Sequence, residues 1–174
     1  MNEIIKTKRL MLKKSSKDEL AFLNDLQNKC INYFSFDPEG SLNDVSMEEC
    51  LENGDLPPGG VKENFSMYSV YYRDKIIGYF DTYRGFPKED IAYISIFFLD
   101  EDNRKQGFGK EIVEELCKYF KSIGFIKVRL GVSLRNWTGL SFWFKNGFCK
   151  ITNVRCDGNC TDENYGVVEL EIEL

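Results

Sequence analysis

The hydrophobic positions in the middle of the chain follow the pattern of β-strands. Residues 65–72 and 75–83 are rich in aromatic and β-branched side chains with a short polar break between them, which predicts an antiparallel hairpin. A third run over residues 91–99 follows a turn and extends this sheet. Apolar and polar side chains alternate over residues 126–133, and this period of two predicts a further strand.

Between the last two of these strands the hydrophobic spacing changes to that of a helix. Over residues 109–122 the apolar side chains recur three and four positions apart, and lysine and glutamate fill the opposite face. A helix with this pattern packs against a sheet. The order strand, loop, helix, strand predicts a parallel crossover at this point.

The two ends of the chain add further elements. Residues 7–14 are predicted to form a first strand, and a capping box at Ser16 opens a helix. Residues 30–61 are irregular apart from a short helix that begins at a second capping box, at Ser46. The remaining predicted elements are a short helix over 136–145 and a final pair of strands over 148–154 and 167–174. The predicted fold class is α/β, a mixed sheet flanked by helices in a single domain, residues 1–174.

Composition narrows the class of protein. With 174 residues and 43% hydrophobic side chains, the chain can bury a core in one domain. No apolar run approaches the length that crosses a bilayer, and the N-terminus lacks the apolar core of a signal peptide, so we expect a cytoplasmic protein with no membrane partner. The net charge of −5 argues against a nucleic-acid partner, which is held by neutralising phosphates.

The absence of histidine restricts the chemistry. It removes Ser-His and Cys-His nucleophiles and the commonest general base, so carboxylates, tyrosines, thiols or water must serve. The six cysteines are scattered, and reduced thiols are expected. Only Cys156 and Cys160, which flank Asp-Gly-Asn, could pair or bind metal. Without histidine or a second cysteine pair, no metal site is expected.

Glycine and cationic residues gather in the loop before the helix at 109–122. This loop has the sequence Arg104-Lys105-Gln106-Gly107-Phe108-Gly109-Lys110. The first amides of a helix lack internal partners and the helix dipole favours an anion, so the loop is predicted to bind a pyrophosphate. The glycines permit a tight turn and a close approach of the backbone.

Two common nucleotide motifs do not fit this loop. The dinucleotide fingerprint requires glycine or alanine at the position of Ile112. The Walker motif requires serine or threonine after the lysine, and the chain has Glu111 there.

Two motifs in order along the chain resemble those of the GCN5-related N-acetyltransferase (GNAT) family. The loop resembles the acetyl-CoA pyrophosphate motif Gln/Arg-x-x-Gly-x-Gly/Ala as Arg104-x-x-Gly107-x-Gly109, and Asn136-x-x-Gly139-x-x-Phe142-Trp143-x-x-x-Gly147-Phe148 resembles the second signature of the family. The opening Thr7-Lys8-Arg9-Leu10-x-Leu12 is similar to the first strand of the branch that contains ribosomal-protein and small-molecule N-acetyltransferases.

The resemblance implies a GNAT-like, centrally splayed sheet and acetyl-CoA as co-substrate, without metal. It assigns the backbone of Phe98 and Leu99, together with Asn136, to the pantetheine arm. It assigns the loop to the pyrophosphate. The implied loop residues are Arg104, Lys105, Gln106, Gly107, Phe108, Gly109 and Lys110. Asn136 can also serve as a helix N-cap.

The resemblance implies direct transfer of the acetyl group to an amine. Trp143 stands where many members carry a tyrosine that protonates sulfur, and an indole has no acidic proton near neutral pH. Ser141, Cys149 or water could act instead. Tyr93 could relay a proton from the amine through water, or it could simply form one face of a half-buried strand.

The acceptor is expected to be a small-molecule or peptide amine. By resemblance, residues 30–61 and the loop from Cys156 to Tyr165 flank the acceptor, and both are acidic, which favours a cationic amine. The alternative is an ordinary solvated acidic surface. Because dimers are common in the family, a homodimer is an option.

Two other classes of function stay open at this point. One is a non-catalytic acyl-CoA-binding module that has lost its general acid. The other is an interaction protein whose glycine loop merely turns the chain and whose aromatic strand residues form a partner surface. Those aromatic residues are Phe65, Tyr68, Tyr71, Tyr72, Phe80 and Tyr83.

Overall fold

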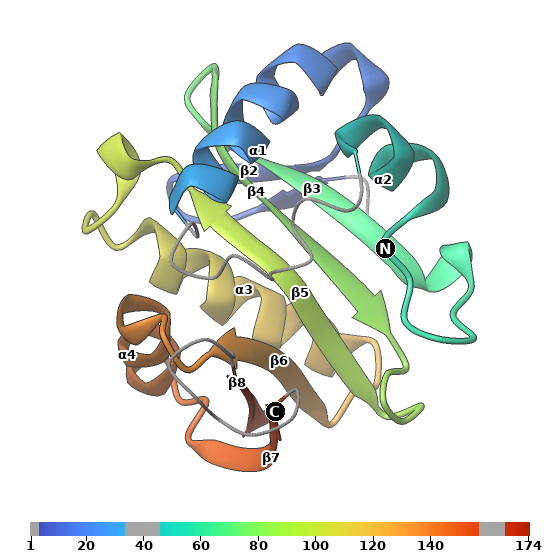
Figure 1. The fold of residues 1–174 in the computed structure, drawn as a ribbon. Coiled ribbons are helices and arrows are strands. Elements are labelled where there is room, and N and C mark those ends of the chain that lie inside the picture. The colour runs from blue at the N-terminus through green and yellow to red at the C-terminus, as the bar shows by residue number, and fades with distance from the viewer. Residues whose placement is uncertain (1–3, 34–45, 157–165) are drawn as a thin grey trace.

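Eight strands form one mixed sheet in the order β1-β2-β3-β4-β5-β6-β8-β7 (Figure 1). The computed structural model describes residues 4–33, 46–156 and 166–174. The strands are β1 (Ile4–Lys6), β2 (Leu10–Lys14), β3 (Phe65–Tyr72), β4 (Lys75–Arg84), β5 (Ile91–Leu99), β6 (Lys127–Ser133), β7 (Lys150–Cys156) and β8 (Gly166–Glu173). The helices are α1 (Leu20–Tyr33), α2 (Met47–Asn53), α3 (Phe108–Ser122) and α4 (Trp137–Lys145).

The sheet opens between its two central strands. Among the described strands, β5 and β6 form the only parallel pair, and α3 makes the crossover between them. Their register runs from Ile91 opposite Lys127 to Ile94 opposite Leu130 and then stops. On the other side of β5, the register with β4 shifts between Phe80 and Thr82. This bulge bends β5 away from β6, so the sheet is splayed at its centre.

Hydrophobic cores fill both faces of the sheet. On one face, the apolar sides of α1 and α2 pack on β3 and β4 through residues such as Leu26, Met47 and Tyr79. On the other face, α3 and α4 pack on the centre of the sheet through residues such as Ile112 and Trp143. The helical spacing of apolar residues in α3 and the alternation in β6 therefore place these elements as the sequence predicts.

The structure confirms the mixed α/β class, the hairpin and the parallel crossover, but it corrects the first strand. Residues 7–14 were predicted as one strand, whereas β1 ends at Lys6 and β2 begins at Leu10. Thr7 makes a turn between them, because its amide donates to Leu10 O at 3.0 Å and its hydroxyl accepts from Leu10 N at 2.9 Å. A side chain that replaces backbone partners in this way ends a strand.

The aromatic residues considered as a partner surface are mostly core residues. Phe65, Tyr68, Phe80 and Tyr83 are buried, and the two remaining tyrosines are half-buried. These strands therefore offer no aromatic docking face. The prediction of reduced thiols is confirmed for the cysteines at positions 30, 50, 117 and 149, which are free. For Cys156 this prediction is wrong, because Cys156 is disulfide-bonded. Cys160 lies outside the described residues.

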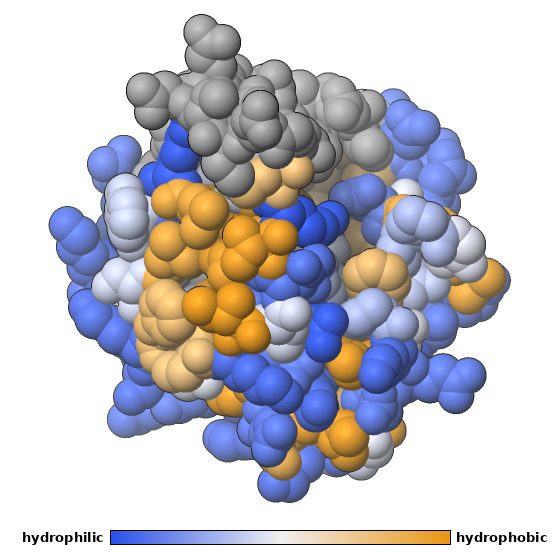
Figure 2. Space-filling view, turned by 60° about the horizontal axis from the view of Figure 1, so that its bottom comes forward, coloured by the Kyte–Doolittle hydropathy of each residue, from blue (hydrophilic) through white to orange (hydrophobic). Residues whose placement is uncertain are grey.

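Ten large hydrophobic side chains of the described residues are exposed at the surface. Figure 2 shows the end of the molecule that lies at the bottom of Figure 1, with a large hydrophobic area at the left and smaller ones among mainly hydrophilic residues. Exposed hydrophobic side chains on α4, the segment before it and β7 include Leu134, Phe144, Ile151 and Val154. No helix of the described residues is long and apolar enough to cross a membrane.

Candidate functional site

Two residues with positive φ shape the loop between β5 and α3. A short 3-10 turn at Glu101–Asn103 follows β5, and Lys105 and Gly107 then have φ of 59° and 81°. Glycine adopts this conformation freely, whereas a lysine adopts it at a cost. Gly107 is the N-cap of α3, and no side chain among the described residues caps the first turn of this helix. The first amides of α3 can therefore serve an anion.

The loop cations divide into two kinds. Arg104 turns back on the protein, since its Nε donates to Leu99 O at 2.7 Å and its guanidinium lies 5.0 Å from the centre of the Phe98 ring. These contacts tie the start of the loop to the end of β5. Lys105 and Lys110 have exposed side chains. An anion at the N-terminus of α3 would meet these two lysines rather than Arg104.

Gly109 is needed for packing. A Cβ atom at this position would lie 2.9 Å from Cε2 of Phe142 on α4. Phe142 in turn stacks on Phe97 of β5, with the ring centres 5.7 Å apart. The second glycine of the loop therefore allows α3 and α4 to approach each other, whatever it contributes to an anion site.

Arg9 anchors this helix from the other end of the chain. Its Nε donates to the Glu111 carboxylate at 2.7 Å, and its backbone amide donates to the same carboxylate at 2.6 Å. The Thr7 hydroxyl is a further donor to it. Burial raises the pKa of Glu111, but the hydrogen bonds from Thr7 and Arg9 outweigh burial and hold this pKa below its usual range.

The same guanidinium also touches the loop. Arg9 Nη1 donates to Gln106 O at 3.0 Å, and Arg9 Cζ lies 4.4 Å from the centre of the Phe108 ring. Sequence reasoning missed this role. The Thr7 to Leu12 motif was the available signal, but Glu111 lies 102 residues from Arg9 along the chain.

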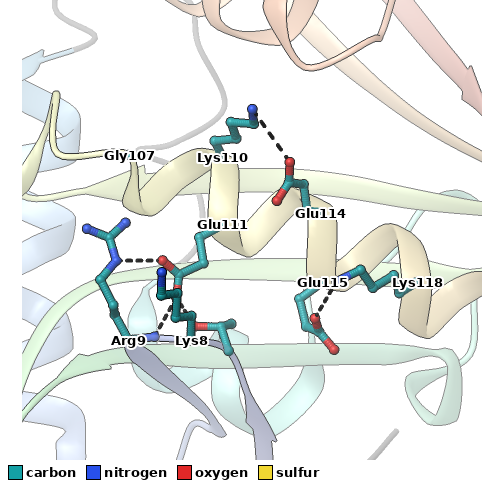
Figure 3. A pocket seen from close by; sticks show the side chains of 9 residues that line it. Lys8, Arg9, Gly107, Lys110, Glu111, Glu114, Glu115 and Lys118 are labelled. Atoms are coloured by element: carbon teal, nitrogen blue, oxygen red, sulfur yellow. Dashed lines mark hydrogen bonds and ion pairs between the residues drawn. The ribbon is translucent and has the colours of Figure 1, made fainter.

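A groove of about 280 Å³ runs along this side of α3 (Figure 3). Its lining residues are Thr7, Lys8, Arg9, Gly107, Lys110, Glu111, Glu114, Glu115 and Lys118. In Figure 3 the Lys110 and Lys118 side chains each point to a glutamate of the same helix, at 3.6 Å from Glu114 and 3.3 Å from Glu115. Charge is thus mixed along the helix, while Lys8, Arg9 and Lys110 gather at its N-terminal end.

Beyond Ile94, the edge of β5 that faces β6 has no strand partner among the described residues. The backbone of residues 95–99 can therefore bind an extended molecule along this edge, as a further strand would. One wall of the opening is aromatic. The Phe97 ring meets the Trp143 ring edge-on at 5.4 Å, and Trp143 packs on Phe148 at 5.0 Å. Trp143 is only 7% exposed, so it is a core residue at this wall.

The remaining predicted site residues lie in different places. Asn136 caps α4, because its side chain accepts from Gly139 N at 2.8 Å. Ser141 is exposed on α4. Tyr93 packs with the α1 and α2 core, on the opposite face of the sheet from Trp143. Burial and the nearby Glu169 raise the pKa of the Tyr93 phenol, which keeps its proton near neutral pH.

The predicted coenzyme residues are therefore continuous in space from the end of β5 to the first turn of α3. The Gly109–Phe142 contact joins them to α4, whose cap is Asn136. In contrast, the catalytic candidates Tyr93, Ser141 and Trp143 do not meet at one point.

Asp81 is a buried carboxylate near this opening that sequence reasoning did not select. It is 2% exposed and accepts a hydrogen bond from Ile96 N at 3.2 Å. Burial raises the pKa of Asp81 to about 7. A signal was present in the sequence, since alternation places Asp81 on the same face of β4 as the buried Tyr79 and Tyr83.

Comparison with known protein families gives a match over most of the chain. A model of the acetyltransferase (GNAT) family matches residues 28–148. No curated protein matches the sequence.

Solved structures with the same fold include several acetyltransferases. The ribosomal α-N-protein acetyltransferase RimL in complex with coenzyme A has a TM-score of 0.78 and 17% identity, covering 99% of this chain and 98% of that one. An acetyltransferase from Salmonella typhimurium that modifies the N-terminal serine of a 50S ribosomal subunit protein has a TM-score of 0.76 and 17% identity, covering 99% of both chains.

A spermidine N-acetyltransferase (SpeG) chimera from Vibrio cholerae and hSSAT is also similar. Its TM-score is 0.69 with 14% identity, over 95% of this chain and 96% of that one. At these identities the similarity establishes a shared fold.

Proposed function

Because the chain belongs to the acetyltransferase (GNAT) family, we propose that it moves an acetyl group from acetyl-CoA to an amine of a small molecule or a peptide. One observation carries the proposal: β5 separates from β6 and then leads into a helix whose first amides are uncapped by any described side chain. A pyrophosphate suits the helix terminus, and the pantetheine arm suits the open strand edge.

In this proposal the amides of Gln106 to Lys110 bind the pyrophosphate, with Lys105 and Lys110 adding charge. The backbone of Phe98 and Leu99 pairs with the pantetheine arm. Asn136, at the start of α4, also contacts the pantetheine arm in this proposal. Its side-chain oxygen already accepts a hydrogen bond from Gly139 N. Support comes from the RimL structure, which is similar in fold and is in complex with coenzyme A.

The reaction is direct acyl transfer. The amine nitrogen forms a bond to the thioester carbonyl carbon, and the carbon–sulfur bond breaks to release the coenzyme A thiolate. The protein positions the two reactants and excludes water from the thioester, for which the aromatic wall of Phe97 and Trp143 is suited. We assign Trp143 to this wall rather than to proton transfer. In this proposal Ser141, Cys149 or water gives a proton to the coenzyme A sulfur.

A cationic acceptor suits the acidic segment around α2. Glu48, Glu49, Glu52 and Asp55 are exposed there, while the acidic loop 157–165 lies outside the described residues. Two relatives of similar fold act on amines: one modifies an N-terminal serine and the other is named for spermidine. A cytoplasmic location, a single domain over residues 1–174 and a homodimer stay predictions.

Calorimetric titration with acetyl-CoA tests the proposal. The variant Lys105→Glu/Lys110→Glu places two carboxylates beside the helix terminus without changing a buried group, and we expect its affinity to fall roughly tenfold to a hundredfold. Lys118→Glu, an exposed lysine further along the same helix, is the matched control and should bind as the wild type does.

Release of free coenzyme A thiol in the presence of spermidine, or of a short peptide with an N-terminal serine, then tests for turnover. Binding with turnover supports the proposal. Binding without turnover over a broad panel of amines indicates an acyl-CoA-binding module. No binding by the folded wild-type protein overturns the proposal.

A further inference from the structure

Asp81 differs from the other buried carboxylates in having no cationic partner. Three carboxylates are buried in the described residues: Glu19, Asp81 and Glu171. Glu19 pairs with Lys13 at 3.2 Å and Glu171 with Arg129 at 2.7 Å. No ion pair of Asp81 occurs within the described part of the chain. An unpaired buried carboxylate is costly, and such groups gather at functional sites.

Asp81 lies at the point where the sheet opens. It faces the bulge in β5, where its carboxylate accepts from the Ile96 amide and hydrogen bonds from Ser95 also act on it. Ser95 comes directly after Ile94, the last residue of β5 that pairs with β6. The carboxylate therefore adjoins the start of the open strand edge that we assign to the pantetheine arm.

Asp81 and the aromatic wall lie on opposite faces of the sheet. Asp81 lies on the α1 and α2 side, with Tyr79 and Tyr83, whereas the aromatic wall belongs to the α3 and α4 side. An amine that approaches the thioester from the acidic α2 side would reach the Asp81 side of the opening first. Ser95 is half-buried and so is more accessible than Asp81.

On this basis, and resting on the proposed function, we propose that Asp81 is the terminal proton acceptor for the acceptor amine and that the Ser95 hydroxyl relays the proton. The ammonium form of the substrate gives a proton to Ser95 Oγ while Ser95 passes its own hydroxyl proton to the Asp81 carboxylate. The neutral amine then attacks the thioester carbonyl. The carbon–sulfur bond breaks, the second amine proton goes to sulfur or to water, and Asp81 returns its proton to solvent.

The surroundings of Asp81 suit proton acceptance near neutral pH. Among the described residues, the titratable and charged groups on this face include Cys30, Cys50, Asp55, Lys62, Tyr79, Tyr83 and Tyr93, with Arg104 near Cys30 and Arg129, Arg155 and Glu169 near Tyr93. Burial raises the pKa of Cys30 and of Cys50 to about 12, so both thiols stay neutral. Burial likewise raises the pKa of Tyr79. With the pKa of Asp81 itself raised to about 7, the carboxylate is ionised above neutrality and can be protonated during turnover.

Asp81→Asn is the decisive variant. Its side-chain oxygen can still accept from Ile96 N, but it cannot take up a proton. We expect single-turnover acetyl transfer to spermidine, and to a peptide with an N-terminal serine, to slow on the order of a hundredfold or more. Acetyl-CoA affinity measured by calorimetry should stay unchanged. In the wild type the transfer rate should rise as the pH increases through about 7. In Asp81→Asn this rise in rate with pH should be absent.

Thermal unfolding separates this role from a structural one. If Asp81 only held the bulge, its replacement would lower the melting temperature. Above about pH 7 the wild-type Asp81 is an unpaired buried charge, which destabilises the fold. The melting temperature of Asp81→Asn should therefore equal or exceed that of the wild type in this pH range. Asp74→Asn, in the exposed turn between β3 and β4, is the control and should match the wild type in rate and pH profile.

Ser95→Ala gives a second test that does not depend on the folding of the Asp81 variant. It should slow transfer roughly tenfold or more while leaving coenzyme affinity unchanged. Wild-type rates in Asp81→Asn, or a rise in rate with pH that persists in it, overturn the proton-acceptor role and leave the proposed function standing. Absence of transfer by the wild-type protein to any amine overturns both.

Discussion

Arg9 holds the Glu111 carboxylate through its backbone amide at 2.6 Å and through its guanidinium at 2.7 Å. One residue next to β2 thereby fixes the first turn of α3. The same guanidinium reaches the carbonyl of Gln106 in the preceding loop. The N-terminal strands thus contribute to the shape of a loop that follows them by almost a hundred residues, and this shape decides where an anion can lie.

A double-mutant cycle on this pair should reveal coupling. Arg9→Ala and Glu111→Gln each remove the ion pair, and we expect each to lower the free energy of unfolding by about 1 kcal/mol. The double variant should lose less than the sum of the two. Urea denaturation measures the cycle, and additive losses would show that the pair is not coupled. Acetyl-CoA affinity should also fall in Arg9→Ala, since Gln106 loses its partner.

Gly109 offers a test of packing against ligand contact. Gly109→Ala should lower the free energy of unfolding by about 1–3 kcal/mol, because its methyl group would lie 2.9 Å from Phe142. This loss should occur even though alanine favours helices more than glycine does. Gly109→Ala should cost less free energy of unfolding when it is introduced into the Phe142→Leu variant than when it is introduced into the wild type. If thermal unfolding shows the same cost in both, the clash is not the cause.

Most of the fold was available from local patterns, whereas the site needed contacts between distant residues. The alternation in β6 and the helical spacing in α3 each report one face of one element, and both were predicted. The turn at Thr7 was missed because it rests on hydrogen bonds between Thr7 and Leu10, which leave no mark in an otherwise continuous strand pattern.

The candidate site shows the same division. The loop glycines marked it in the sequence, but the reason for Gly109 lies in Phe142 on another helix. Asp81 was present on the inward face of β4, yet its importance depends on a bulge in β5 and on its having no ion pair among the described residues. Neither can be seen in the residues around Asp81 itself.

Glu171 should govern acid stability. Burial raises its pKa, but the hydrogen bonds from Arg129 and Lys150 outweigh burial and bring the pKa down to about 2, below the ordinary value of 4.5. This contribution is fully present above about pH 4.5 and is lost as the pH falls through about 2. Glu171→Gln should therefore lower the free energy of unfolding by on the order of 3 kcal/mol near neutral pH.

The difference between Glu171→Gln and the wild type should shrink as the pH is lowered toward 2. Urea denaturation at several pH values measures it. Glu173→Gln, an exposed neighbour on the same strand, serves as the control and should follow the wild type throughout. A gap between Glu171→Gln and the wild type that stays constant with pH would assign the loss to shape rather than to charge.

Acceptor charge can be tested by comparing amines. If the acidic surface around α2 attracts the substrate, spermidine should have a higher kcat/KM than a neutral amine of similar size, and added salt should reduce this advantage. Glu48→Gln/Glu52→Gln should lower kcat/KM for spermidine several-fold and leave the neutral amine unaffected. Equal rates for both amines at low and high salt would show that this surface is only solvated.

The short parallel ladder between β5 and β6 divides the sheet into two antiparallel halves. The first half, β1 to β5, consists of consecutive strands, whereas the second is built from β6, β8 and β7. A pantetheine arm along the open edge of β5 would lie where the two halves separate. It would therefore link the two halves through its contacts with both. In the free protein, the backbone amides of β5 beyond Ile94 should exchange with solvent faster than amides within the antiparallel ladders. Coenzyme binding should slow this exchange, because the two halves of the sheet are then held together.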